Sequence, residues 1–164
     1  MSDNYAVING TRVELTDDQV KVLGIETRNN PFDRVEQFNK YYRVTAANQV
    51  DDYVEVLDST DNRLYDVANY FNDKDFANQV ALHQLLYRNL LKFAYDNGCE
   101  DTEWDLNNRH YYIIGSFGGK NLGFDSDDVF KRQGTVYFSS KDGAIQAINE
   151  VVKPFMKEHP EFVW

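Results

Sequence analysis

Residues 72–97 have the sequence NDKDFANQVALHQLLYRNLLKFAYDN. Apolar side chains recur along it at helical spacing, at Phe76, Val80, Leu86, Leu90 and Phe93. This periodicity predicts one amphipathic helix of about 23–25 residues, which we expect to pack on a sheet.

Polar residues at the two ends of this stretch set the expected limits of the helix. Asn72 can cap the first turn, and Asp73 and Asp75 suit the positive end of the helix dipole. Asn97 and Gly98 end the helix, because both tolerate the left-handed backbone that follows a last turn.

The segments on either side of this helix favour strands. Asn9–Gly10 is a strong hairpin signal between two short strands, and Thr16 with Gln19 forms a capping box that opens a short helix with Val20 and Leu23 inward and Gly24 as its stop. Further strands are expected at 41–45, 50–57, 111–117, 122–124 and 135–138, with a turn at 59–62, an extended piece at 64–67 and a turn at Gly118–Gly119. A second helix begins at Ser139 or Ser140, and Phe155, Phe162 and Trp164 must then either dock somewhere or stay exposed.

The predicted fold is therefore α+β: a mostly antiparallel sheet packed on one long central helix and a C-terminal helix. We expect a single domain over residues 1–164, with a possible N-terminal hairpin-and-helix subdomain over 1–30. We find no internal repeat, low-complexity run or linker in the sequence.

The net charge limits the kinds of partner that the protein can bind. Lys and Arg number 17 and Asp and Glu 27, a net charge of −10. Such a surface would repel nucleic acid but can attract a basic protein. The alternative interpretation is that the negative charge only keeps the protein soluble. With one cysteine and no apolar leader or membrane-length segment, the expected location is the cytoplasm.

Catalytic and metal-binding motifs are not found. Gly115–Lys120 lacks the spacing of a phosphate-binding loop, and the histidines at 83, 110 and 159 are too far apart for a local zinc site. Cys99 beside Glu100 and Asp101 should have a raised thiol pKa. We therefore expect no enzyme activity, cofactor or metal.

Acidic residues interleaved with tyrosines are the unusual feature that remains. Each tyrosine doublet in a strand should point one ring inward and one outward, and exposed rings could anchor a protein partner, although tyrosine is also a common strand residue. Asp125–Asp128 lacks the glycine and glutamate of a calcium loop and is expected to be solvated. The candidate partner-binding residues are Asp51, Asp52, Tyr53, Glu55, Asp58, Glu100, Asp101, Glu103, Asp125, Asp127 and Asp128.

Several motifs resemble small accessory proteins of phages and prophages of Gram-positive bacteria. They include Val13-Glu-Leu-Thr-Asp-Asp-Gln19, Asn69-Tyr-Phe-Asn-Asp-Lys74, Val136-Tyr-Phe-Ser-Ser140 and Val152-Lys-Pro-Phe-Met-Lys-Glu-His-Pro-Glu-Phe162. The resemblance covers nearly the whole chain. It implies a gene set that takes over the host or counters its defences, and it carries no individual residue role.

Charge and resemblance together favour a non-enzymatic, phage-encoded inhibitor in the cytoplasm of an infected bacterium. The most concrete version is an anti-CRISPR protein whose carboxylates block the nucleic-acid channel of a Cas9-type nuclease. The alternative is a small-molecule binding protein that sequesters a nucleotide immune signal. That alternative requires a pocket lined by basic residues, for which the candidates are Arg88, Lys92, Arg109 and Lys120.

Overall fold

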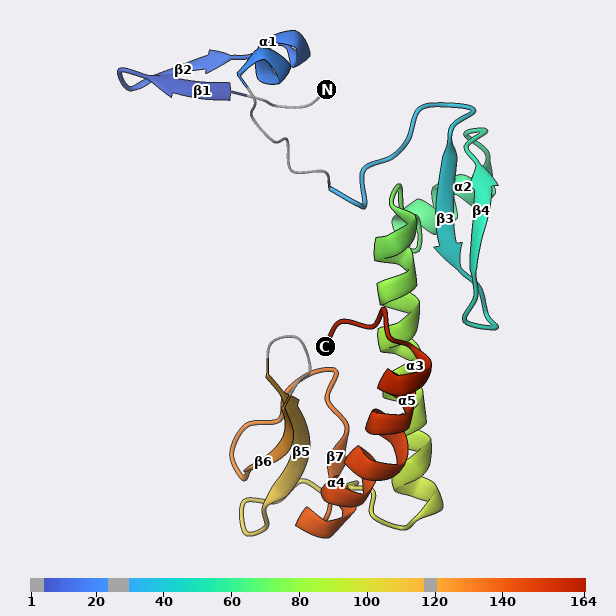
Figure 1. Cartoon of the computed structure of the whole chain (residues 1–164), viewed down its shortest axis with the longest axis vertical. Coiled ribbons are helices and arrows are strands. Elements are labelled where there is room, and N and C mark those ends of the chain that lie inside the picture. Colours follow the sequence, from blue (N-terminus) through green and yellow to red (C-terminus); the bar gives the residue numbers. More distant parts are fainter. Residues whose placement is uncertain (1–4, 24–29, 117–120) are drawn as a thin grey trace.

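The computed structural model describes residues 5–23, 30–116 and 121–164. It confirms an α+β architecture in which all antiparallel strands after the first two pack on two long helical segments (Figure 1). The first segment is helix α3 (Lys74–Asp96). The second is continuous through α4 (Lys141–Ala147), the π-helical stretch η2 (Ile148–Val152) and α5 (Lys153–Glu158), and it lies beside α3.

The strands form three small sheets. Strands β1 (Tyr5–Ile8) and β2 (Thr11–Glu14) make a hairpin that is followed by helix α1 (Asp17–Val22). Strands β3 (Lys40–Val44) and β4 (Val50–Val54) make a second hairpin. The third sheet has the order β6-β5-β7, from β5 (His110–Gly115), β6 (Leu122–Asp127) and β7 (Tyr137–Phe138).

The long central helix agrees with its prediction apart from its first residues. Asp73, rather than Asn72, caps α3, and its carboxylate accepts hydrogen bonds from the N–H groups of Asp75 and Phe76 at 2.8 and 3.0 Å. The Asn72 side chain instead donates to the backbone carbonyls of Asn30 and Asp33. It therefore fixes the incoming chain rather than the helix.

Residues 59–66 form helix α2 (Ser59–Asp66), so the predicted turn and extended piece at this position are wrong. The helix is nucleated by a capping box: the Asp58 carboxylate accepts from the N–H groups of Thr60 and Asp61, and the Asp61 carboxylate accepts from the N–H of Asp58. The buried residue of this helix is Asp61, at a position where an apolar residue is usual. The spacing of apolar residues that would predict a helix is therefore missing from the sequence.

Smaller differences concern the ends of elements. Strand β4 ends at Val54 rather than at residue 57, and β7 holds two residues rather than four. The capping box of Thr16 and Gln19 is confirmed, with Val20 buried, but Leu23 is exposed. The predicted stop at Gly24 and turn at Gly118–Gly119 lie outside the described residues. Within the described part of the chain, no helix is both long and apolar enough to cross a membrane.

Two parts of the chain share one architecture, so the expectation of no internal repeat was wrong. The segments 70–79 and 137–146, YFNDKDFANQ and YFSSKDGAIQ, are identical at six of ten positions, namely Tyr, Phe, Lys, Asp, Ala and Gln. Each segment leads from an extended Tyr-Phe pair into a helix whose cap lies two residues after the phenylalanine, at Asp73 or Ser140.

The backbone pairing is repeated as well. Phe71 pairs with Tyr42 of β3, and Phe138 pairs with Tyr111 of β5. The next residue in each copy donates its N–H to the loop before the hairpin: Asn72 to the carbonyl of Pro31 at 2.9 Å, and Ser139 to that of Cys99 at 3.0 Å. We call residues 30–97 the first repeat and residues 98–164 the second repeat.

Helix α3 joins the two repeats. Its first half buries Ala77 and Ala81 against Val44 and Phe71 of the first repeat. Its second half is buried against the second repeat, through Leu82, Leu86, Leu90, Phe93 and Ala94 packing on residues that include Phe138, Ala144 and Val152.

The C-terminal tail docks on the core, which decides between the two outcomes that the sequence left open. Phe155 and Phe162 are buried. The amide of Gln79 on α3 holds the tail in both directions, donating to the carbonyl of Glu161 at 2.7 Å and accepting the N–H of Val163 at 3.0 Å. The Trp164 ring lies against Gly115, where a Cβ atom would be 2.3 Å from Nε1 of the indole.

Half of the tyrosines that lie among the acidic residues are buried in the core, namely Tyr41, Tyr70, Tyr112 and Tyr137. The doublets Tyr41–Tyr42 and Tyr111–Tyr112 each have one buried and one half-buried ring, as predicted. In Tyr70–Phe71 and Tyr137–Phe138, however, both rings are buried, so the one-in, one-out prediction is wrong there. These observations favour packing over an exposed tyrosine surface.

Candidate functional site

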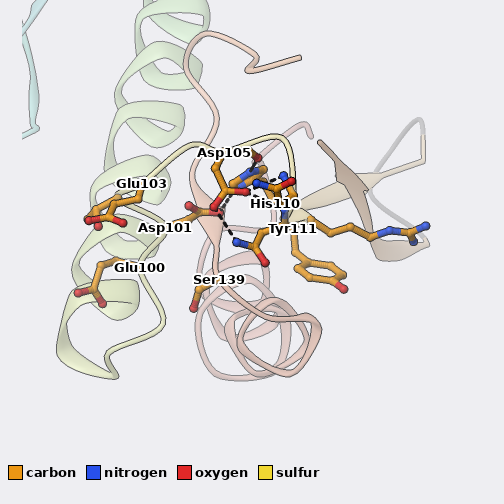
Figure 2. Close-up of a pocket in the computed structure, with 11 residues that line it drawn as sticks. Glu100, Asp101, Glu103, Asp105, His110, Tyr111 and Ser139 are labelled. Carbon is orange, nitrogen blue, oxygen red and sulfur yellow. Dashed lines mark hydrogen bonds and ion pairs between the residues drawn. The ribbon is translucent and has the colours of Figure 1, made fainter. Parts of the chain in front are cut away.

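An open cavity of about 540 Å³ lies between the loop that precedes β5 and the start of the C-terminal helix (Figure 2). We call it the acidic cavity, because carboxylates dominate its lining. The lining residues are Glu100, Asp101, Thr102, Glu103, Asp105, Asn107, Asn108, Arg109, His110, Tyr111 and Ser139.

Local hydrogen bonds fix the loop that supplies most of these residues. One carboxylate oxygen of Asp105 accepts the N–H groups of Asn107 and Asn108 at 2.7 and 2.9 Å, and the other accepts the Asn108 side-chain amide at 2.7 Å. These bonds, led by the one from the Asn107 backbone, lower the pKa of Asp105. Asp105 therefore stays ionised while it shapes the turn.

His110 anchors the same loop from the first position of β5, and it is 1% exposed. Its Nδ1 lies 2.5 Å from the Asp101 carboxylate, and its Nε2 lies 2.8 Å from the Asp105 carbonyl oxygen. Burial alone would lower the pKa of His110, but the hydrogen bonds to Asp105 and Asp101 raise it overall. Because both neighbours carry acceptor oxygens, both ring nitrogens of His110 are placed to donate, an arrangement that favours the protonated ring.

Aromatic stacking completes this arrangement. The Trp104 ring stacks on His110 with the centroids 3.8 Å apart and contacts Tyr137 edge-on at 5.0 Å. Asp101 and Asp105 are turned toward His110, whereas Glu100 and Glu103 point away from it (Figure 2). The cavity thus has two carboxylates engaged in its framework and two on its other side.

The two repeats differ at this place. Phe32 of the first repeat is one residue after Pro31, as Glu100 is one residue after Cys99 in the second repeat. Phe32 packs on Phe71 and Phe76 with centroid distances of 5.4 and 5.3 Å. A carboxylate in the second repeat stands where the first repeat has an aromatic ring.

The candidate residues of the first repeat have separate roles. Asp51 and Asp52 are exposed on β4, and Asp52 forms an ion pair with Lys40 at 2.7 Å that lowers its pKa. Tyr53 is half-buried beneath the guanidinium of Arg43. Asp58 is the cap of α2.

Glu55 is 0% exposed, so it is not part of any surface, and its place among the partner-binding candidates was wrong. Arg34 binds its two oxygens at 2.8 and 3.0 Å, and Tyr70 donates to it at 2.7 Å. The hydrogen bond from Arg34 is the main reason that the pKa of Glu55 is lowered. Glu55 is a structural anion of the first repeat.

The candidates on β6 stand apart from the acidic cavity. Asp125 accepts the hydroxyl of Tyr112 at 3.2 Å, and Asp127 accepts the N–H groups of Val129 and Phe130 at 2.9 and 3.0 Å, which lowers its pKa. Asp128 is exposed. Of the predicted residues, therefore, Glu100, Asp101 and Glu103 are gathered in the cavity.

Sequence reasoning missed several residues of the cavity, chiefly Asp105, Asn107, Asn108 and His110. The spacing of Asp105 and Asn107 is typical of a side-chain-stabilised turn and could have indicated a rigid loop. Cys99 was treated correctly: burial, and then the charge of Glu100, raise the pKa of its thiol.

The basic residues proposed for a small-molecule pocket do not converge. Arg109 lines the acidic cavity, Arg88 lines a second cavity with His83 and Tyr87, and Lys92 lines a third, where it pairs with Asp96. Lys120 lies outside the described residues. Within residues 5–23, 30–116 and 121–164, no cluster of three or more His, Cys, Asp or Glu side chains is placed to hold a metal ion.

Comparison of the chain with models of protein families, with curated proteins and with solved structures gives no match. The resemblance to phage accessory proteins therefore stays a prediction.

Proposed function

We propose that the protein is a non-enzymatic inhibitor that binds a basic groove on a partner protein. The observation that carries the proposal is the gathering of Glu100, Asp101, Glu103 and Asp105 around one open cavity, against Arg109 and His110. Asp101 and Asp105 hold the loop, whereas Glu100 and Glu103 point away from His110 (Figure 2) and can accept hydrogen bonds from lysine or arginine side chains, as phosphates otherwise do. The net charge of −10 would speed the encounter with a basic partner.

The contacts of His110 support a binding role over catalysis. A general base needs a free ring nitrogen within reach of its substrate. Both nitrogens of His110 are engaged, by Asp101 and by the carbonyl of Asp105, and its ring is covered by Trp104. Histidine is the side chain best suited to proton transfer near neutral pH, but His110 serves here to hold the loop.

The concrete form of the proposal is an anti-CRISPR protein that occupies the nucleic-acid channel of a Cas9-type nuclease in the cytoplasm of an infected bacterium. Charge favours the channel as the target, and the resemblance to phage proteins favours the biological setting. Sequestration of a nucleotide signal finds less support, because the basic residues that it needs line three different cavities.

The test is DNA cleavage by a guide-loaded Cas9-type nuclease in the presence of the protein. We expect inhibition by the wild type, and inhibition about tenfold weaker or more for the Glu100→Gln, Glu103→Gln double variant, since hydrogen bonds to charged groups contribute about 1.5–3 kcal/mol each. The matched control is Glu150→Gln, Glu158→Gln, which removes two charges from a different cavity.

Salt separates this proposal from its alternative. Association should slow as salt rises, because the Debye length falls from about 10 Å at 0.1 M to about 3 Å at 1 M. Equal inhibition by the two double variants would contradict a role for the acidic cavity. If the nuclease is unaffected, and Arg109→Gln abolishes binding of a labelled cyclic nucleotide, the small-molecule function takes its place.

A further inference from the structure

The N-terminal unit, residues 5–23, is too small to be stable by itself. It consists of one two-stranded hairpin and a six-residue helix, and isolated hairpins are marginal in water. Val20 is its buried apolar side chain, whereas Val22 at the end of α1 is 87% exposed. The other exposed large apolar residues of this unit are Tyr5, Val7, Ile8, Val13 and Leu23. A unit with this balance needs another surface to pack on.

The first repeat carries such a surface at the end of the β3–β4 hairpin. We call Phe38, Val54, Val56 and Leu57 the hairpin-end patch; all four side chains are exposed, Phe38 by 72%. They are neighbours, because the Phe38 N–H donates to the carbonyl of Glu55, the residue between Val54 and Val56. The first half of α3 packs further along the same hairpin, against Val44.

Two residues of the patch have an unusual backbone. Phe38 and Leu57 have φ angles of +71° and +62°, in the left-handed region that bulky side chains rarely adopt. Such a conformation is strained for residues with large side chains, and strained residues cluster at functional sites. Here it accompanies two large apolar side chains that contribute little to the core.

The chain itself brings the N-terminal unit to this patch. Residues 24–29 connect Leu23 to Asn30, and the seven steps between these two residues span at most about 25 Å. The side chain of Asn72 binds the backbone carbonyls of Asn30 and Asp33. Arg34 is paired with Glu55, which lies between the patch residues Val54 and Val56. The unit is therefore tethered within a short reach of the patch.

We propose that the N-terminal unit docks on the hairpin-end patch of its own chain, through the exposed apolar side chains of α1 and of the β1–β2 hairpin. A short tether gives an effective concentration in the millimolar range. A contact with a Kd of about 0.1 mM between separate molecules would then be about nine-tenths closed.

The test is amide hydrogen exchange of the full-length protein, followed by mass spectrometry. In the wild type we expect exchange over residues 5–23 to be at least tenfold slower than in Val56→Lys, which places a charge in the patch. Val22→Lys should have the same effect from the other side of the contact, although lysine favours helix at least as well as valine. Val129→Lys, a change of an exposed valine in the second repeat, should match the wild type.

Exchange over α3 and the effect of dilution serve as controls. Exchange over α3 should be equal in all four proteins, which shows that each variant is folded. Protection of residues 5–23 should not change on hundredfold dilution, because the contact is intramolecular. Equal exchange of this segment in the wild type and Val56→Lys overturns the proposal, and so does protection that is lost on dilution, which would indicate a second copy as the occupant.

Discussion

Replacing Arg34 by methionine removes the cation from a buried carboxylate and keeps most of the side-chain stem. Glu55 would be left at 0% exposure with one hydroxyl, from Tyr70, and one backbone N–H, from Leu57. Removing one partner of a buried ion pair typically costs about 3–5 kcal/mol. Because the Arg34 side chain is 28% exposed, water can replace part of it, and we expect a loss of about 3 kcal/mol.

The assay is urea denaturation at pH 7, followed by circular dichroism, with Lys40→Met as the control. Lys40 also loses a carboxylate partner, Asp52, but both members of that pair are exposed, so the unfolding midpoint should not change measurably. A loss below about 1 kcal/mol in Arg34→Met would refute the structural role assigned to Glu55.

The pH dependence gives a second check on the same reasoning. The pKa of Glu55 is lowered in the folded state, so its contribution is present above its unfolded pKa, about 4.3, and is lost as the pH falls through the folded value. The difference between wild type and Arg34→Met should therefore shrink on acidification, since a protonated Glu55 needs no cation. A difference that grows toward low pH would contradict this account.

Three further predictions concern other parts of the molecule. Leu90→Ala should cost about 2–5 kcal/mol in urea denaturation, because Leu90 is buried between α3 and the second repeat; an unchanged midpoint would show that it is not in the core. The pKa of His110 is raised, so its contribution is complete below about pH 6.5 and lost as the pH rises through the folded value. The wild type should therefore lose stability relative to His110→Gln between pH 6 and pH 9, and parallel curves would exclude a buried imidazolium. Gly115→Ala should displace the Trp164 ring and increase its quenching by acrylamide, whereas unchanged quenching would mean that the tail does not dock at this glycine.

The sequence allowed prediction of those elements whose signal is local. Helix α3 was predictable because its apolar period continues for nearly five turns, and the capping box of Thr16 and Gln19 because both partners lie within one turn. Helix α2 was not, because its buried residue is Asp61, which interrupts the apolar pattern.

The candidate site was predictable only in part, for a related reason. Glu100, Asp101 and Glu103 are adjacent in the sequence, so they also gather in space. Glu55 has the residue type of a surface group, and its partner Arg34 lies 21 residues away, a pairing that no local pattern reveals. The repeat escaped notice because its identities are confined to ten residues between hairpins of different sequence.

The position of α3 in both repeats has a practical consequence for dissecting this protein. A cut at Gly98 would leave the first repeat with a helix whose second half presents Leu86, Leu90 and Phe93 to water. The separated second repeat would lack helix α3, on which Phe138 and Ala144 pack. Fragments made at the boundary between the repeats should therefore aggregate or stay unfolded when expressed alone, and should regain structure when co-expressed. Mapping of the partner-binding surface is accordingly better done with point substitutions in the intact chain than with truncations.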